Sequence, residues 1–129
     1  HPAFAGGRIS PALLLGRLWR LFGADATIFP NWGGRFAFSR GECLAIADAA
    51  REPLGRHLPA LPVPAGGMRV ERCPEMLAAF GPDTMLLIGG DLLAAGPAMP
   101  ARAAAAASAL RAARTEGGAF AADRRSAAA

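Results

Sequence analysis

Glycine pairs and one arginine are the features of this sequence whose types and spacing point to ligand binding. Gly66-Gly67 and Gly89-Gly90 each follow a short apolar run, and Arg35 follows a third pair, Gly33-Gly34. A glycine pair lets backbone N–H groups come close to an anion, and the N-terminus of a following helix adds partial positive charge. Tight turns also use glycine pairs without any ligand. The spacing therefore favours phosphate capture, with a plain turn as the alternative for each pair.

Two side chains could act together with such a phosphate site. Arg35 follows a glycine hinge, from which its guanidinium can fold over a bound phosphate or carboxylate; a solvated loop arginine is the alternative. His1, at a strand end, can serve as acid, base or anion partner, or it can simply fray. Weaker candidates are His57 as a surface residue, Asp91 as a cap of the next turn, and Asn31 and Trp32 as pocket lining or loop packing.

Several common catalytic motifs do not occur. The sequence contains no GxSxG elbow, no HExxH, no EF-hand pattern and no GxGxxG after a strand. Hydrolase, zinc protease and dinucleotide-binding functions therefore have no support from motifs.

Helices and strands alternate in the pattern of apolar residues and caps. We expect helices from the Ser10 cap to Gly23, from the Ser39 cap to before Pro53, from Pro74 to Gly81, and from Pro100 to Arg114 with Gly117 near the end. Strands are expected at Ala26 to Phe29, buried on both faces, briefly around Val63, and at Thr84 to Ile88, the clearest of the three. Arg17 and Arg20 are expected on the solvent side of the first helix.

This alternation is typical of a parallel sheet. In such folds ligands gather at the carboxyl ends of strands, where three loops are expected: Pro30 to Phe38, Ala65 to Arg69, and Gly89 to Leu93. Glycine pairs after two successive strands match the usual phosphate site of a (β/α)8 barrel. Because three strands cannot close a barrel of eight, the pattern indicates the second half of one.

Composition limits the possible classes. The chain has 129 residues and 13.2 kDa, 53% of them hydrophobic, which allows one small domain or a piece of a larger one. All 14 basic residues are arginines, and they are scattered among 10 acidic residues. We therefore expect no continuous basic surface of the kind that binds a nucleic-acid backbone. The apolar runs are too short to span a membrane. Cys43 and Cys73 lack metal-site spacing and favour a reducing, cytoplasmic setting. Because the first residue is His1, we expect the chain to start within a longer protein.

The segments HPAFAG, GRLWRLFGADATIFPNWGGRFAFS and PVPAGGMRVERCPEMLAAFGPDTMLLIGGDL carry a family resemblance. Over about residues 1 to 115, they are similar to the carboxyl-terminal half of the RuBisCO large-subunit barrel, and more closely to RuBisCO-like proteins of the form IV type. The resemblance implies an α/β fold, a partial (β/α)8 (TIM) barrel over residues 1–117 with a low-complexity tail at 118–129. It implies phosphate binding by Gly66, Gly67, Gly89 and Gly90, and it places the family's strand-five histidine on His1 and its loop-six cation on Arg35.

Departures from the family pattern argue against carboxylation. Arg35 stands where the carboxylase has a lysine, while Pro2, Ile28 and Ala65 replace an arginine, a histidine and a serine. The resemblance therefore implies a fragment of a RuBisCO-like enzyme that catalyses enolisation, as an isomerase, enolase or decarboxylase, on a phosphorylated keto-sugar-derived substrate. A fragment of a true ribulose-bisphosphate carboxylase and a non-catalytic truncated half-barrel are the alternatives.

The resemblance also implies a cofactor and partners. The family stabilises its enolate with Mg²⁺, held by a carbamylated lysine and acidic residues on a strand that precedes His1. We therefore expect the 129-residue chain alone to be inactive. The full-length protein is expected to be a cytoplasmic homodimer that binds a phosphorylated small molecule and neither nucleic acid nor membrane.

Overall fold

The computed structural model describes residues 9–126. They form two compact units: the first comprises residues 9–68 and 83–87, and the second comprises residues 69–82 and 88–126. No helix among these residues combines the length and apolar composition needed to span a membrane. Each unit is described by itself below.

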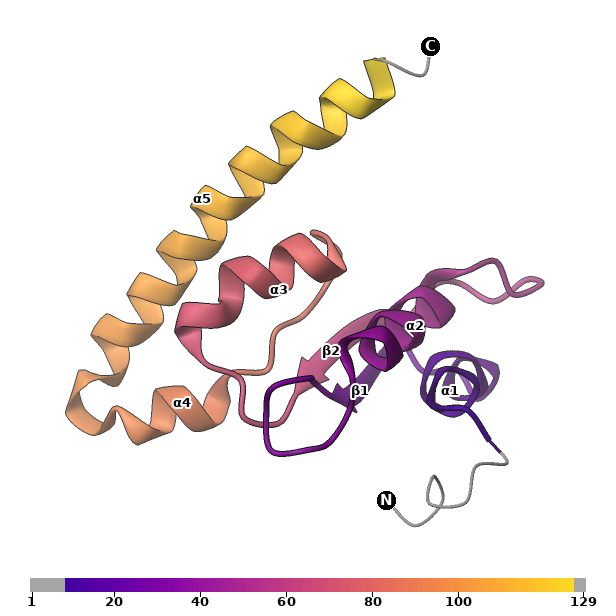
Figure 1. The fold of residues 1–129 in the computed structure, drawn as a ribbon, viewed down its shortest axis with the longest axis horizontal. Helices are drawn as coiled ribbons and strands as arrows, with labels where there is room; N and C mark the ends of the chain where they lie inside the picture. Colours follow the sequence, from indigo (N-terminus) through magenta and orange to yellow (C-terminus); the bar gives the residue numbers. More distant parts are fainter. Residues whose placement is uncertain (1–8, 127–129) are drawn as a thin grey trace. The chain divides into compact units, whose positions relative to one another are not determined.

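The first unit is built on a strand–helix–strand repeat. Strand β1 (Ala26–Pro30) is followed by helix α2 (Arg40–Arg51) and strand β2 (Leu61–Ala65). The strands pair in parallel with Ala26 opposite Leu61 and Pro30 opposite Ala65, and Figure 1 shows them side by side with α2 next to them. The expected α/β fold class therefore agrees with the structure, in which helices accompany a parallel sheet of two strands. The structure does not by itself show a partial barrel.

The predicted strand at Thr84 to Ile88 is wrong as a regular strand. The segment does run beside β2, because Met85 N–H donates to the Pro62 carbonyl at 3.1 Å and Leu87 N–H donates to the Pro64 carbonyl at 3.2 Å. A regular parallel ladder would also need N–H groups from residues 62 and 64, and proline has none. Half of the ladder is therefore missing, and the segment stays extended without becoming a third strand.

Strand β1 is covered on one face, so its predicted burial on both faces is also wrong. Thr27 and Phe29 are buried, whereas Ile28 is 62% exposed. Helix α2 contributes the buried Cys43 and Ile46, and the Cys43 thiol donates to the Pro30 carbonyl at 3.3 Å. Since side chains alternate along a strand, the helices of this unit pack on the face of Thr27 and Phe29.

The first helix begins where the caps predict. It is a π-helix over Ala12–Leu18 that continues as α1 (Trp19–Leu21) and ends before Gly23, whose φ is 86°. The Ser10 hydroxyl accepts a hydrogen bond from Leu13 N–H at 3.1 Å. Gly16 is buried against Ala49 of α2, where a Cβ would come within 2.5 Å of the alanine methyl. Helix α2 starts at the predicted Ser39 cap, which forms a capping box with Glu42.

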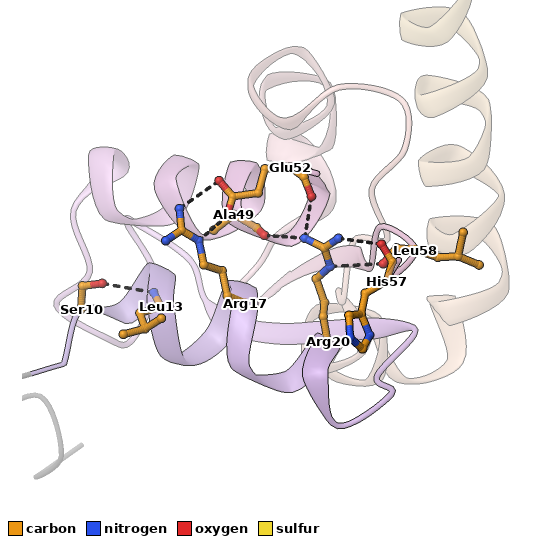
Figure 2. Close-up of polar contacts among 8 residues, drawn as sticks. All are labelled: Ser10, Leu13, Arg17, Arg20, Ala49, Glu52, His57 and Leu58. Carbon is orange, nitrogen blue, oxygen red and sulfur yellow. Dashed lines mark hydrogen bonds and ion pairs between the residues drawn. The ribbon is translucent and has the colours of Figure 1, made fainter. Parts of the chain in front are cut away.

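Arg20 is not on the solvent side, contrary to prediction. Its side chain is 2% exposed and donates hydrogen bonds to the carbonyls of Ala49, Glu52, His57 and Leu58, as Figure 2 shows. Arg17 is exposed as predicted and pairs with the Glu52 carboxylate, with a 3.0 Å bond from Nη2 to Oε2. Helical periodicity places both arginines opposite the leucines, but that face meets the carboxyl end of α2, where free carbonyls attract a cation.

The second unit is helical. Its elements are η2 (Val70–Arg72), α3 (Cys73–Phe80), α4 (Gly89–Ala94), η3 (Gly96–Ala98) and α5 (Met99–Ser126). Pro74 lies in the first turn of α3 and Gly81 ends it with a φ of 84°, both as predicted. Helix α5 continues past the predicted end near Gly117, because the surrounding alanines have the highest helix propensity and glycine weakens a helix without having to end it.

Candidate functional site

Two loops meet at the carboxyl ends of β1 and β2. The loop after β1 carries Gly33-Gly34 and Arg35, and the loop after β2 carries Gly66-Gly67. The backbones approach so closely that a Cβ on Gly34 would overlap the Gly66 carbonyl oxygen. Asn31 N–H donates to the Ala65 carbonyl at 2.8 Å and anchors the first loop at its base. For these two of the three predicted loops, the expected position at the carboxyl ends of parallel strands is confirmed.

The Gly66-Gly67 pair has a conformation that favours glycine. The φ values are 85° and 83°, in the left-handed region where other residues are strained. A Cβ on Gly66 would meet the Phe36 ring at 2.8 Å, so loop packing alone already requires a small residue here. The N–H groups of the two glycines donate to no acceptor among the described backbone and side-chain groups, while the Gly66 carbonyl accepts from Arg35 N–H at 3.3 Å. The described part of the chain therefore uses neither N–H group as a donor.

Arg35 lies directly beside this pair. Its side chain is exposed, and a Cβ on Gly67 would be 3.2 Å from the Arg35 nitrogen and 3.5 Å from its Cγ. The Arg35 guanidinium carbon lies 5.9 Å from the centre of the Phe36 ring, within cation–π range. The structure thus places an accessible cation next to the backbone of a glycine pair.

The other predicted site residues are not part of these two loops. Gly89 and Gly90 belong to the second unit, where they form the first turn of α4 instead of a loop before a later helix. Their N–H groups have no acceptor among the described residues, as is usual in a first helical turn. His1 lies outside the described residues. The structure therefore brings together Arg35, Gly66 and Gly67.

Asp91 fixes the second unit instead of capping a turn. Its carboxylate accepts from Val70 N–H at 3.1 Å and from Arg102 Nη2 at 2.7 Å, and Arg102 also pairs with Glu71 at 2.7 Å. These contacts, the Val70 N–H bond first and the Arg102 guanidinium second, lower the pKa of Asp91 below its ordinary value. Through these bonds the Asp91 carboxylate links η2, which contains Val70, to α5, which contains Arg102. An open depression of about 550 Å³ lies over this cluster and is otherwise lined mainly by alanines.

The remaining weak candidates have structural roles. Asn31 is fully buried and its amide donates to the Met68 sulfur at 2.9 Å, so it packs within the loop and does not line an open pocket. The Trp32 ring lies 5.7 Å from the Arg40 guanidinium. His57 is half-buried, and its carbonyl accepts from Arg20 at 3.3 Å. Sequence reasoning missed Phe36, although an aromatic residue directly after Arg35 in a glycine-rich loop is a usable signal.

The described residues do not fit a magnesium site. Among residues 9–113, whose side chains the structure describes, no three His, Cys, Asp or Glu side chains cluster in a way that could hold a metal ion. Several carboxylates are committed to other partners: Glu42 to Ser39, Glu52 to Arg17, and Glu71 and Asp91 to Arg102. The Cys43 and Cys73 thiols are buried, and this burial raises the pKa of both. The chemistry of the donor set therefore gives no place for Mg²⁺ in this part of the chain.

Known proteins resemble the chain closely enough to assign its family. It is 58% identical to ribulose bisphosphate carboxylase-like protein 1 of Rhodopseudomonas palustris over 81% of the chain. The crystal structure of a RuBisCO-like protein from Rhodopseudomonas palustris matches 86% of the chain with a TM-score of 0.70 and 47% identity, covering 29% of that protein. This chain belongs to the RuBisCO superfamily, among the RuBisCO-like proteins. No family model matches it.

Two relatives within this family carry the names of enzymes. The 5-methylthioribulose-1-phosphate isomerase of Rhodospirillum rubrum is 57% identical over 74% of the chain, and the 2,3-diketo-5-methylthiopentyl-1-phosphate enolase of Geobacillus kaustophilus is 38% identical over 71%. The chain spans 28% of the length of the Rhodopseudomonas protein, 26% of the isomerase and 24% of the enolase. The matched family thus includes isomerases and enolases much longer than this chain.

Proposed function

We propose that this chain is the phosphate-binding part of a RuBisCO-like enzyme. The enzyme removes a proton next to the carbonyl of a phosphorylated keto sugar and thereby catalyses an isomerase, enolase or decarboxylase type of reaction. The observation that carries the proposal is the exposed Arg35 held beside the Gly66-Gly67 backbone where two parallel strands end. Phosphate is the ligand that fits a fixed cation next to free backbone N–H groups.

Each residue has a distinct role in this proposal. Gly66 and Gly67 donate backbone N–H groups to the substrate phosphate, and Gly89 and Gly90 take the same role by family resemblance. Arg35 closes over the bound substrate through its guanidinium, which can form two parallel bonds to a phosphate or carboxylate. His1 assists proton transfer or orients the substrate. The glycines and Arg35 bind and orient the substrate, so they account for its capture.

The isomerase type is the best supported of the three reactions. Identity to the Rhodospirillum isomerase is 57%, against 38% for the Geobacillus enolase. Both names describe a substrate with a phosphate at carbon 1 and a methylthio group at carbon 5. A monophosphate of this kind is the substrate class that we assign to the complete enzyme.

The proposal requires more protein than this chain. The metal ligands that the family resemblance implies have to come from residues outside 9–113, since the carboxylates described there do not fit. We therefore propose that the 129-residue chain has no turnover by itself. We also propose that the complete protein is a cytoplasmic homodimer, as in the family.

A chimeric enzyme tests the proposal. The 96-residue segment of the Rhodospirillum isomerase that matches this chain is replaced by the residues of this chain. We expect the chimera to isomerise 5-methylthioribulose 1-phosphate, with the 129-residue chain alone as the inactive control. A folded chimera that fails to bind the substrate would contradict the assignment of the phosphate site. A chimera that releases a different enolisation product would keep the site and replace the isomerase assignment.

A further inference from the structure

We propose that Phe36 is a positioning residue that sets where Arg35 stands over the glycine pair. The inference rests on the proposed function of Arg35 and Gly66-Gly67, and it adds a residue to which neither the sequence pattern nor the family resemblance gave a role. Three contacts of the loop after β1 carry it.

The first contact joins the Phe36 ring to Gly66. The Phe36 Cε2 and Cδ2 atoms lie 2.8 and 2.9 Å from the point where a Cβ of Gly66 would stand. The ring therefore occupies the space that a side chain at position 66 would fill. Because the Gly66 φ of 85° also favours glycine, the ring rests on a stretch of backbone that has little freedom to change.

The second contact joins the same ring to Arg35. The guanidinium carbon is 5.9 Å from the ring centre, where the negative face of the ring attracts a cation. Phe36 is 50% exposed, so one part of the ring is covered while another remains open. The ring thus links the loop cation to the glycine backbone.

The third contact fixes the Arg35 backbone. Its N–H donates to the Gly66 carbonyl at 3.3 Å, so backbone and side chain are both tied to the same neighbour. A long, exposed arginine otherwise samples many rotamers, and ligand binding has to immobilise it. A cation already held beside the phosphate loop loses less freedom on binding. Removal of the ring should therefore weaken substrate capture while leaving the later chemical steps unchanged.

Kinetics of the chimera distinguish positioning from simple packing. Phe36→Leu keeps an apolar side chain but removes the aromatic face, and we expect KM to rise about tenfold with kcat unchanged. Phe36→Tyr keeps the face and should restore KM. In an Arg35→Ala background, Phe36→Leu should add little, because the residue acts through the arginine. The matched control is Phe22→Leu, a 74% exposed phenylalanine that precedes β1 instead of following it.

Two kinetic results would overturn the inference. One is an unchanged KM in Phe36→Leu. The other is an equal rise in KM when Phe36→Leu is made with Arg35 present and in the Arg35→Ala background, which would mean that Phe36 serves the fold alone.

Nuclear magnetic resonance of the full 129-residue chain separates this inference from the proposed function. In the unmodified chain, the Phe36 ring should shift the Gly66 α-proton resonances, and hydrogen exchange at the Arg35 amide should be slowed. Phe36→Leu should remove both effects, whether or not the chimera turns over. If both effects persist in the variant, the positioning role is wrong even when the enzyme is active.

Discussion

Arg20 joins the first helix to the carboxyl end of α2. Its guanidinium serves four carbonyl groups, from Ala49, Glu52, His57 and Leu58, while only 2% of the residue is exposed. Buried carbonyls that lose their donors are costly, because water cannot reach them to replace the bond. The packing of the helix therefore depends on this side chain.

We expect Arg20→Met to lower the free energy of unfolding by about 2–4 kcal/mol, since methionine fills the space but satisfies no carbonyl. Urea denaturation followed by circular dichroism measures the change. Arg17→Met is the matched control: it removes an exposed pair with Glu52 on the same helix and should change stability little. An equal fall in the free energy of unfolding in the two variants would show that the buried hydrogen bonds of Arg20 stabilise the fold no more than the exposed pair of Arg17.

Gly34 is the second residue with a testable role. Any Cβ at this position would overlap the Gly66 carbonyl oxygen, which belongs to the backbone and cannot rotate away. Gly34→Ala should therefore push the two loops apart, lower the melting temperature and release the Arg35 amide from Gly66. Gly41→Ala is the control, because its Cβ would meet nothing within 4 Å and alanine favours helix α2 by about 0.5–1 kcal/mol. An unchanged Arg35 amide in Gly34→Ala would contradict the close approach.

Among the elements, the locally determined features were predictable from sequence. The Ser10 and Ser39 caps and the glycine stops at Gly23 and Gly81 lie where the pattern placed them. Caps and turns depend on a few neighbouring residues, so a short stretch of sequence contains the physical cause. The meeting of the loops after β1 and β2 was also predictable, because parallel strands bring their carboxyl ends together.

Features that depend on distant partners were not predictable. The segment at 84–88 has the composition of a strand, yet its ladder fails because the neighbouring β2 has prolines at 62 and 64. Arg20 has the helical position of a solvated residue, yet it meets the carbonyl groups of α2. The part of the site formed by Phe36 was missed for the same reason, since its contact with Gly66 crosses from one loop to another.

The ion cluster that joins η2, α4 and α5 gives stability a pH dependence. The pKa of Asp91 is lowered in the folded chain, so its bonds to Val70 and Arg102 stabilise the fold above the unfolded pKa of about 3.9. That contribution is lost as the pH falls through the lowered folded-state value. Asp91→Asn should therefore be less stable than the unmodified chain near neutral pH, and the difference should shrink below about pH 4. Thermal melts of both proteins across this pH range measure the difference in melting temperature. A difference that stays constant with pH would refute the role assigned to the Asp91 carboxylate.

At the scale of the whole molecule, the chain matches only about a quarter of the length of its relatives. Its relatives are about three times longer, and the described residues place Arg35 beside Gly66 and Gly67 without a cluster of side chains that could hold a metal ion. Family membership follows from sequence identity and fold, whereas the proposed reaction depends on groups that residues outside this chain would have to bring to the same substrate. Enolisation is therefore the claim that needs the most direct test.

Exchange of the substrate proton in the chimera provides that test. The chimera is incubated in heavy water with 5-methylthioribulose 1-phosphate, and mass spectrometry follows deuterium uptake at the carbon next to the carbonyl. Proton removal that forms an enolate predicts uptake at that carbon, and Arg35→Ala should slow it by weakening substrate capture. A chimera that binds the substrate but takes up no deuterium, while the parent isomerase does so under the same conditions, would contradict the proposed function.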